Sequence, residues 1–299
     1  MAGTTSWVLV GSTLSEPFTR DQDVDQGCNL STALFNIYIN DLPSAFNTAT
    51  QPFIIDPALA RVNDALFADD YKVLAESEVA CQAAVDACKQ HSRLWRWRAN
   101  LGVNKTAVVV YSKPAARPPP PTIMWGSTTL QIQDSYKHLG VWFTEDGSWD
   151  KHVDEVFLKA TRRVDQLTKF LTAPALTVPV KRQLIITCLL PIFDFGSSVW
   201  HVSVAQAKAL GAQYRRAARL VLQCPVSTPV PAIMGDLGLA PLEQRWDLAK
   251  LRLQHQILRM SGERHPRIVH DMAWPGSGRH MWQQRINSIW RVLLPDSDS

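Results

Sequence analysis

Two adjacent carboxylates stand among apolar residues at Phe67–Asp70, the string Phe-Ala-Asp-Asp. Short apolar runs flank the pair, which predicts a β-hairpin over residues 65–75 with Asp69 and Asp70 at its turn. Like charges this close repel each other, so a divalent cation is a natural partner. Mg²⁺ typically takes one or two protein carboxylates, and two such ions hold both oxygens of a phosphoryl transfer. Taken alone, the string is more typical of a solvated turn, where Asp is an ordinary residue.

The composition is that of a folded globular protein. Apolar residues make up 46% and charged residues 19% of 299, which excludes a disordered chain and allows one or two domains with a sizeable core. The five cysteines include no Cys-x-x-Cys pair, which argues against a disulfide framework. The apolar run 184–193 is too short to span a membrane and the N-terminus lacks a signal peptide's basic region. We therefore expect an intracellular protein, nuclear or cytoplasmic.

The two halves of the chain carry opposite net charge. Residues 1–150 contain 11 Lys and Arg against 16 Asp and Glu, whereas residues 151–299 contain 20 against 11. An acidic half beside a basic half suits a metal site next to a surface that binds a polyanion. Ordinary surface scatter explains the same numbers equally well.

The hydrophobic period changes near residue 147. Before it, strands are predicted at 6–10, 16–20, 106–111, 123–132 and 136–144, the last two as a pair, with helices at 31–42, where Pro43 ends the helix, and at 78–98. After it, helices are predicted at 153–171, 179–193, 206–222, 246–260 and 281–294, with a polar loop at 261–266. The sequence therefore predicts an α+β part followed by an all-helical part.

Four strings, in this order, resemble motifs of reverse transcriptases, particularly those of non-LTR (LINE-type) retrotransposons. They are residues 26–42 for motif B, Phe67–Asp70 for motif C, Leu101–Thr106 for motif D and Tyr136–Val141 for motif E. The resemblance covers residues 5–260. It implies a partial right-hand polymerase, with an antiparallel palm over 1–146, a helical thumb over 147–260 and a C-terminal extension over 261–299.

The resemblance also implies roles for single residues. Asp69 would be a ligand of the catalytic Mg²⁺, with Asp70 beside it as a second ligand or a structural support. Gln26, Gly27 and Ser31 would lie near the templating base and the incoming nucleotide. Lys105 would assist proton transfer to the departing pyrophosphate, although a solvated turn lysine is an equally good interpretation.

The motif E string would form the primer grip. Its residues are Lys137, His138, Leu139 and Gly140. The resemblance places Lys137 and His138 near the primer backbone, while the simpler interpretation of His138 is a half-buried strand histidine.

Basic pairs in the helical part suit phosphate contacts of a thumb. They are Arg162 and Arg163, Lys181 and Arg182, and Arg215 and Arg216. A solvated helix face opposite an apolar stripe accounts for most such pairs, so this alternative stays open.

The sequence also departs from the family pattern. The family's motif A, which supplies a further catalytic Asp, is not found before Gln26, so we expect an N-terminally truncated domain. Asp23 and Asp25 add negative charge where template phosphate or nucleotide should approach. We therefore expect an RNA-directed DNA polymerase domain that uses an RNA template, a DNA primer and dNTPs but is inactive alone, and that self-associates through an exposed sheet edge. The alternative is a catalytically dead module that binds nucleic acid, or the product of a decayed element.

Overall fold

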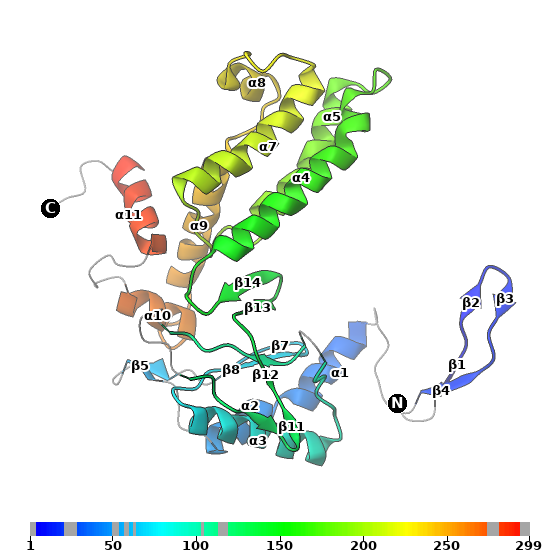
Figure 1. Ribbon diagram of the computed structural model, residues 1–299, viewed down its shortest axis with the longest axis vertical. Helices are drawn as coiled ribbons and strands as arrows, with labels where there is room; N and C mark the ends of the chain where they lie inside the picture. Colours follow the sequence, from blue (N-terminus) through cyan, green and yellow to red (C-terminus); the bar gives the residue numbers. More distant parts are fainter. Residues whose placement is uncertain are drawn as a thin grey trace. The chain divides into compact units, whose positions relative to one another are not determined.

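The computed structural model describes residues 4–20, 29–49, 54–56, 60–61, 64–102, 105–112, 119–273 and 281–293 (Figure 1). Its helices and small, mainly antiparallel sheets make it an α+β chain. The chain packs into two compact units. The first, here called unit 1, comprises Met1–Ile54, Arg61–Leu101 and Thr122–Leu130; unit 2 comprises Ile55–Ala60, Gly102–Pro121 and Gln131–Ser299. The expected division at residues 146 and 260 stays a prediction.

Unit 1 begins with an antiparallel ribbon and continues with helices and two further hairpins. The ribbon consists of β1 (Thr4–Ser6) paired with β4 (Phe18–Arg20), and β2 (Leu9–Val10) paired with β3 (Thr13–Leu14). There follow α1 (Asn29–Ile39), α2 (Leu42–Ala49), β7 (Asp64–Phe67), β8 (Asp70–Val73), α3 (Glu78–Trp95), β10 (Met124–Trp125) and β11 (Thr128–Thr129). The short strands β5 (Ile54–Asp56) and β6 (Ala60–Arg61) pair with each other between α2 and β7.

Helix α3 is the centre of unit 1. The Ser77 side chain accepts a hydrogen bond from the backbone N–H of Ala80, which caps the first turn, and Arg96 ends the helix in a left-handed conformation. Its small buried residues, Ala84, Ala87 and Cys88, pack against Ile39 and Leu42 of α1 and α2. Glu78 and Gln82 accept hydrogen bonds from the backbone of Thr122 and Met124, so the strand after the proline-rich loop is held against α3.

Unit 2 contains two short strand pairs and a bundle of helices. Strand β9 (Ala107–Val108) pairs in parallel with β12 (Gln131–Ile132), and β13 (Ser135–His138) pairs with β14 (Val141–Thr144). The helices are α4 (Asp150–Thr172), α5 (Val178–Leu184), α6 (Leu190–Asp194), α7 (Val204–Leu222), α8 (Val230–Asp236), α9 (Leu242–Leu258), α10 (His265–Ala273) and α11 (Met281–Leu293). No described helix is both long and apolar enough to cross a lipid bilayer.

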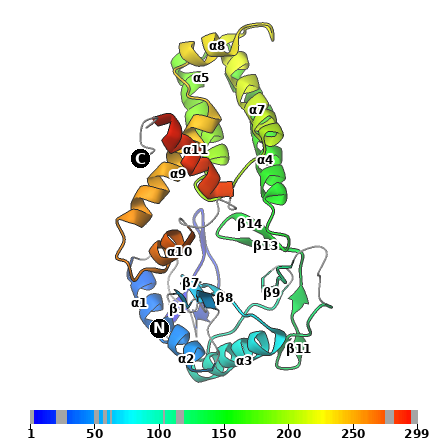
Figure 2. The same cartoon turned by 90° about the vertical axis from the view of Figure 1, so that its left-hand side faces the viewer.

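The core of unit 2 lies along the contact between α4 and α7, which run side by side (Figures 1 and 2). The apolar stripe of α4, predicted from its period, is buried at Val153, Val156, Ala160, Val164, Leu167 and Leu171. Helix α7 presents small residues to the core, including Ala217 and Ala218, both fully buried. Small side chains let two helix backbones approach closely, so α4 and α7 pack directly against each other.

Two expected helices were wrong in the regions around prolines. Pro43 does not end the first helix, which already stops at Ile39; it stands in the first turn of α2, where its missing N–H costs nothing. The helix expected over 179–193 is interrupted by a π-helical turn, Ile185–Leu189, in which Leu190 donates to the carbonyl of Ile185. Pro191 follows directly and lacks the N–H that the regular ladder needs there.

The strand pairing expected between 123–132 and 136–144 was also wrong. Each region instead makes its own hairpin, β10–β11 and β13–β14, and Gln131 and Ile132 pair in parallel with β9. Gly126, with a φ of +66°, and Gly140, with a φ of +84°, permit these two tight turns. Helix α8 and the start of α10 inside the expected loop 261–266 were likewise not predicted, because each is too short to show a helical period.

His152, at the start of α4, makes the stability of unit 2 depend on pH. The backbone N–H of Trp142 donates to its Nδ1 at 3.4 Å, so this atom must be unprotonated. Burial lowers the pKa of His152 to about 4, helped by Lys159 and Lys137 and opposed by Glu155. Because the folded-state pKa lies below the ordinary value, the unfolded chain binds more protons between pH 6.5 and 4. Stability is then complete above about pH 6.5 and falls by up to about 3 kcal/mol as the pH drops to 4.

The prediction is checked by urea unfolding between pH 7.5 and 4. His152→Gln, whose amide oxygen can still accept from Trp142, should flatten the decline, whereas the exposed control His255→Gln should leave it unchanged. Burial also lowers the pKa of His201. This residue should therefore leave a smaller dependence of stability on pH in both variants. An equal decline in wild type and His152→Gln would contradict the prediction.

Candidate functional site

The two acidic residues at 69 and 70 lie at the tip of the hairpin expected for them. Strands β7 and β8 pair antiparallel, with Phe67 opposite Asp70 and Leu66 opposite Tyr71. Ala68 and Asp69 form the two-residue turn, and Ala68 has a φ of +51°. A left-handed alanine costs about 1 kcal/mol or more, so the turn is strained as well as tight. Strain of this kind concentrates at functional sites.

The two faces of this hairpin have different surroundings. Leu66, Tyr71 and Val73 share one face, which packs on the core beneath α3. On the other face, Asp70 is exposed and Phe67 is 63% exposed. Asp69 is also exposed, so both carboxylates are accessible to a ligand from the side away from the core.

Lys72 shares the open face with Asp70, two residues away. Burial lowers the pKa of Lys72, and the negative charge of Asp70 opposes that effect. Its positive charge beside two carboxylates reduces their mutual repulsion. Lys72 was not predicted as a site residue, although a lysine two positions after an acidic pair can be recognised in a sequence.

The donor set of the turn fits part of a Mg²⁺ site. Two neighbouring carboxylates are what Mg²⁺ ordinarily takes from a protein, because water and phosphate oxygens complete its octahedron. Within the described residues, no group of three or more Asp, Glu, His or Cys side chains is placed to hold a metal ion. At such a site Asp69 and Asp70 would supply two ligands, and other oxygens would fill the remaining positions.

Helix α1, which carries Ser31, is anchored to α3 by a buried histidine. Trp97 donates through Nε1 to His91 Nδ1 at 2.9 Å, so His91 carries its proton on Nε2 and donates to Asp41 Oδ1, also at 2.9 Å. This hydrogen bond lowers the pKa of Asp41, the residue just after the turn that ends α1. Ser31 is partly exposed, whereas Gln26 and Gly27, together with Asp23 and Asp25, lie outside the described residues.

The predicted primer-grip string forms the hairpin β13–β14 in unit 2. Leu139 and Gly140 make its turn, with φ values of +47° and +84°. Two successive positive φ angles define the turn type that matches the twist of the flanking strands. Lys137 is exposed and His138 is partly buried. The Tyr136 hydroxyl donates to the backbone carbonyl of Lys105 at 2.8 Å, so the structure brings the Lys105 loop next to this hairpin.

We expect Gly140→Ala to destabilise unit 2. A Cβ at residue 140 would approach Cε1 of Phe195 to 2.7 Å, and its φ lies in the left-handed region. Placing an alanine in this left-handed backbone conformation costs about 1–2 kcal/mol by itself. Thermal unfolding of the variant checks this, with Gly235→Ala as the control, because no heavy atom lies within 4 Å of the corresponding Cβ there. Equal melting temperatures of the two variants would contradict the assigned turn.

Lys151 links the primer-grip hairpin to α4. Its Nζ donates to Ser135 Oγ at 2.5 Å and lies 4.3 Å from the centre of the Trp142 ring. With His152 bound to the Trp142 backbone, the first turn of α4 fixes β13 and β14. Sequence period alone could not identify Lys151, since its contacts are made across two elements.

The basic pairs of unit 2 have different environments. Arg162 and Arg163 are exposed on α4. Arg216 is exposed and forms an ion pair with Asp165 at 2.8 Å, and Arg215 lies over Gly211. Lys181 is only 4% exposed, and Arg182 donates to the carbonyls of Leu237 and Gly238. The surface of α4 and α7 is therefore the more accessible of these basic regions.

The segment that matches a known protein family contains the acidic hairpin and most of the primer-grip hairpin. The family profile for reverse transcriptase (RNA-dependent DNA polymerase) matches residues 4–143. A protein of Drosophila melanogaster, described as a probable RNA-directed DNA polymerase from transposon BS, is 24% identical over 265 residues, which cover 84% of this chain. The aligned region spans 28% of the length of that relative. The chain therefore carries a segment, residues 4–143, that matches reverse transcriptases, and it is similar to an RNA-directed DNA polymerase described as coming from a transposon.

Proposed function

We propose that the chain acts as the palm and thumb of an RNA-directed DNA polymerase. The palm would comprise residues 1–146 and the thumb residues 147–260, with an extension over 261–299. Its substrates would be an RNA template, a DNA primer and dNTPs. The reaction would join the primer 3′-hydroxyl to the α-phosphate of the nucleotide and release pyrophosphate.

One observation carries this proposal. Two adjacent carboxylates, Asp69 and Asp70, stand at a strained and exposed hairpin turn whose opposite face is anchored in the core. The turn lies inside the segment that matches the reverse transcriptase family. A rigid, accessible acidic tip suits a reaction in which positioning and charge stabilisation dominate.

Each of the candidate site residues would have its own role in the reaction. Asp69 and Asp70 would hold a divalent ion, which supplies charge neutralisation at the nucleotide phosphates when bound. Lys105 would stand near the departing pyrophosphate. Lys137 and His138 on the primer-grip hairpin would hold the primer backbone, with Leu139 and Gly140 shaping its turn. Gln26, Gly27 and Ser31 would contact the templating base and the nucleotide.

Primer extension on an RNA template tests the function. We expect a polypeptide of these 299 residues to be inactive alone, because a two-metal site needs a further carboxylate beside Asp69 and Asp70. Supplying a strand with that acid from a related reverse transcriptase should restore extension, and Asp69→Asn should abolish it. Extension that survives Asp69→Asn and Asp70→Asn together would overturn the assigned site.

We also expect salt-sensitive binding of nucleic acid that does not depend on sequence. Replacing Arg162, Arg163, Arg215 and Arg216 by Gln removes four positive charges from α4 and α7. Each neutralised phosphate contributes about 0.7–0.9 to the slope of log affinity against log salt, so the slope should fall by up to about 3. Fluorescence anisotropy with a labelled RNA–DNA duplex from 50 to 300 mM salt measures it.

The matched control removes positive charge elsewhere in unit 2, with Arg252→Gln and Arg259→Gln on the exposed side of α9 and at its end. These changes should alter the slope less. If the fourfold variant binds as tightly as wild type at low salt, the four arginines are an ordinary solvated surface. Binding by a chain that stays inactive after the acidic strand is supplied would favour the alternative of a non-catalytic nucleic-acid-binding module.

A further inference from the structure

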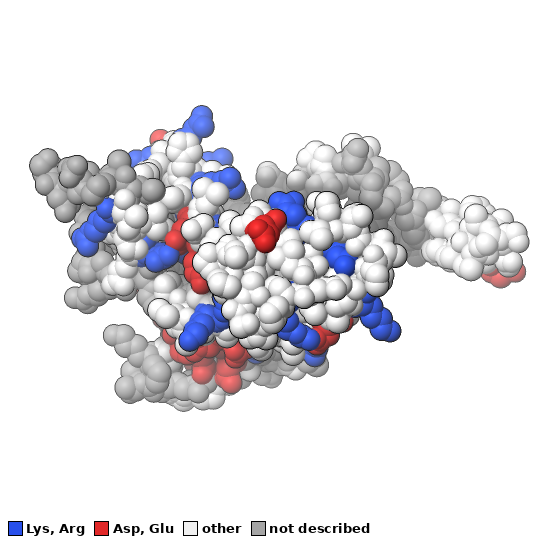
Figure 3. All heavy atoms as spheres, turned by 90° about the horizontal axis from the view of Figure 1, so that it is seen from above, with Lys and Arg blue, Asp and Glu red and all other residues white. Residues whose placement is uncertain are grey.

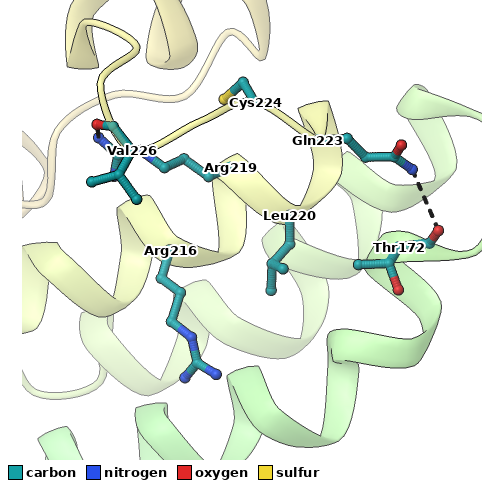
Figure 4. A pocket seen from close by; sticks show the side chains of 7 residues that line it. All are labelled: Thr172, Arg216, Arg219, Leu220, Gln223, Cys224 and Val226. Atoms are coloured by element: carbon teal, nitrogen blue, oxygen red, sulfur yellow. Dashed lines mark hydrogen bonds between the residues drawn. The ribbon is translucent and has the colours of Figure 1, made fainter.

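A pocket of about 440 Å³ lies where α4 and α7 end in unit 2 (Figure 4). Helix α7 contributes Arg216, Arg219 and Leu220, and the loop after it contributes Cys224 and Val226. Thr172, the last residue of α4, forms the opposite wall, and the Gln223 side chain donates to its carbonyl at 3.4 Å. The pocket is separate from the acidic hairpin and from the primer-grip hairpin, since none of their residues lines it.

Arg219 leaves part of its hydrogen-bonding capacity unused in this pocket. Its Nη2 donates to the carbonyl of Val226 at 3.3 Å, and the side chain extends toward Val226 in Figure 4. Its Nε is buried and has no hydrogen-bond partner among the described residues. A buried charged donor without an acceptor is costly, so an anionic ligand that supplies one would be stabilised.

A second arginine adds positive charge at the rim. Arg216 pairs with Asp165 at 2.8 Å, and both side chains are about half exposed, at 47% and 56%. Exposed ion pairs contribute little to stability, so a carboxylate entering the pocket can compete with Asp165 for this guanidinium.

Two segments that adjoin the pocket are uncharged. Residues 173–180 and 223–235 contain no Lys, Arg, Asp or Glu. Four of their valines are exposed, Val178 by 44%, Val180 by 47%, Val226 by 84% and Val230 by 37%. Figure 3 views the molecule from above, and uncharged residues cover most of the surface nearest the viewer. Contiguous apolar surface with arginine nearby is typical of a protein interface.

The chemistry of the pocket disfavours nucleic acid. None of the residues that line it is aromatic, so it offers no ring on which a base could stack. Asp165 at the rim would repel a continuous phosphate backbone. The uncharged segments 173–180 and 223–235 add no cations to neutralise one. A ligand with one or two negative charges among aliphatic groups matches both features.

We propose that this pocket docks a peptide segment of a partner protein in which an acidic residue stands among aliphatic residues. After a small shift of the Arg219 side chain that uncovers its Nε, the carboxylate would accept from this atom and from Arg216, while the aliphatic side chains would cover Leu220 and Val226. The interaction would recruit the partner to the helical unit independently of the polymerase site.

Selection from a random heptapeptide phage library on the full chain tests the proposal. The expected result is enrichment of peptides with Asp or Glu next to Leu, Ile or Val. A synthetic copy of an enriched peptide should bind at least about tenfold more weakly to Arg219→Gln, because a charge-assisted hydrogen bond is lost. Val226→Ser should weaken binding about threefold or more through lost apolar contact.

A variant that strengthens binding keeps the test valid if Arg219→Gln misfolds. Asp165→Asn frees Arg216, so it should tighten peptide binding by up to about fivefold, in keeping with the loss of an exposed ion pair. Arg252→Gln and Val204→Ser are matched controls outside the pocket, and Val204 is 88% exposed at the start of α7. Both should bind like wild type.

Three outcomes would overturn the proposal. One is the absence of enrichment, and another is enrichment of basic peptides. The third is displacement of the peptide by a single-stranded oligonucleotide at equal concentration from the Arg216→Gln variant, which lacks the arginine shared with the phosphate-binding surface; this would show that the pocket itself accepts nucleic acid.

Discussion

Asp69→Asn should weaken the binding of a divalent cation to the acidic hairpin by about tenfold or more, because Mg²⁺ sites depend on the charge of very few protein ligands. Asp70→Asn should act in the same direction. Both residues are exposed at a turn, where Asn is well tolerated, so the variants should fold like wild type. Any loss of binding then reports on the site.

Fe²⁺-dependent backbone cleavage measures this directly, since an ion bound at a site cuts the chain nearby. Cleavage is expected next to residues 68–70, with Mg²⁺ competing and both variants showing little of it. The control is Asp86→Asn, at an exposed carboxylate on α3 that accepts a hydrogen bond from the Gln82 side chain. Cleavage that persists at the hairpin in the double variant would show that the two carboxylates are a solvated turn.

Trp200→Ala should lower the free energy of unfolding of unit 2 by about 3–5 kcal/mol, the range for removing a large buried side chain. Trp200 is fully buried, and its ring lies 5.3 Å from that of Trp246 and 5.6 Å from that of His152. Its Nε1 donates to the carbonyl of Phe195 at 2.9 Å. The alanine would leave both a cavity and an unsatisfied carbonyl, in a protein whose total stability is about 5–15 kcal/mol.

Urea unfolding followed by far-ultraviolet circular dichroism measures the effect without depending on tryptophan fluorescence. Trp200→Phe helps to separate the two contributions, because it keeps an aromatic ring but loses the N–H donor and part of the indole; about 1–3 kcal/mol is expected for it. Phe170→Ala, at a side chain that is 55% exposed on α4, is the control and should cost less than about 1 kcal/mol. A loss below that limit for Trp200→Ala would contradict the packing described.

The elements with strong local signals were predicted from the sequence. Helices α3, α4 and α7 have long amphipathic stripes, and the hairpin around Asp69 and Asp70 has apolar strands on both sides of two turn residues. The order of the motifs identified the family before any contact was known. The apolar period failed near Pro43, which stands in the first turn of α2 and does not end α1, and near Pro191, whose missing N–H accompanies the π-helical turn.

By itself, then, the sequence determined the α+β and helical character of the two parts, the reverse transcriptase resemblance and the position of the acidic turn. Only the tertiary structure decided which side chains are available. In the structure Lys181 is buried, and Arg182 donates hydrogen bonds to the carbonyls of Leu237 and Gly238. His91 is oriented by hydrogen bonds to Asp41 and Trp97. The tertiary structure also joins Arg216 and Arg219 to an uncharged loop to make the pocket. The physical reason is that period and composition report burial along one element, whereas hydrogen bonds and cavities are made between elements distant in the chain.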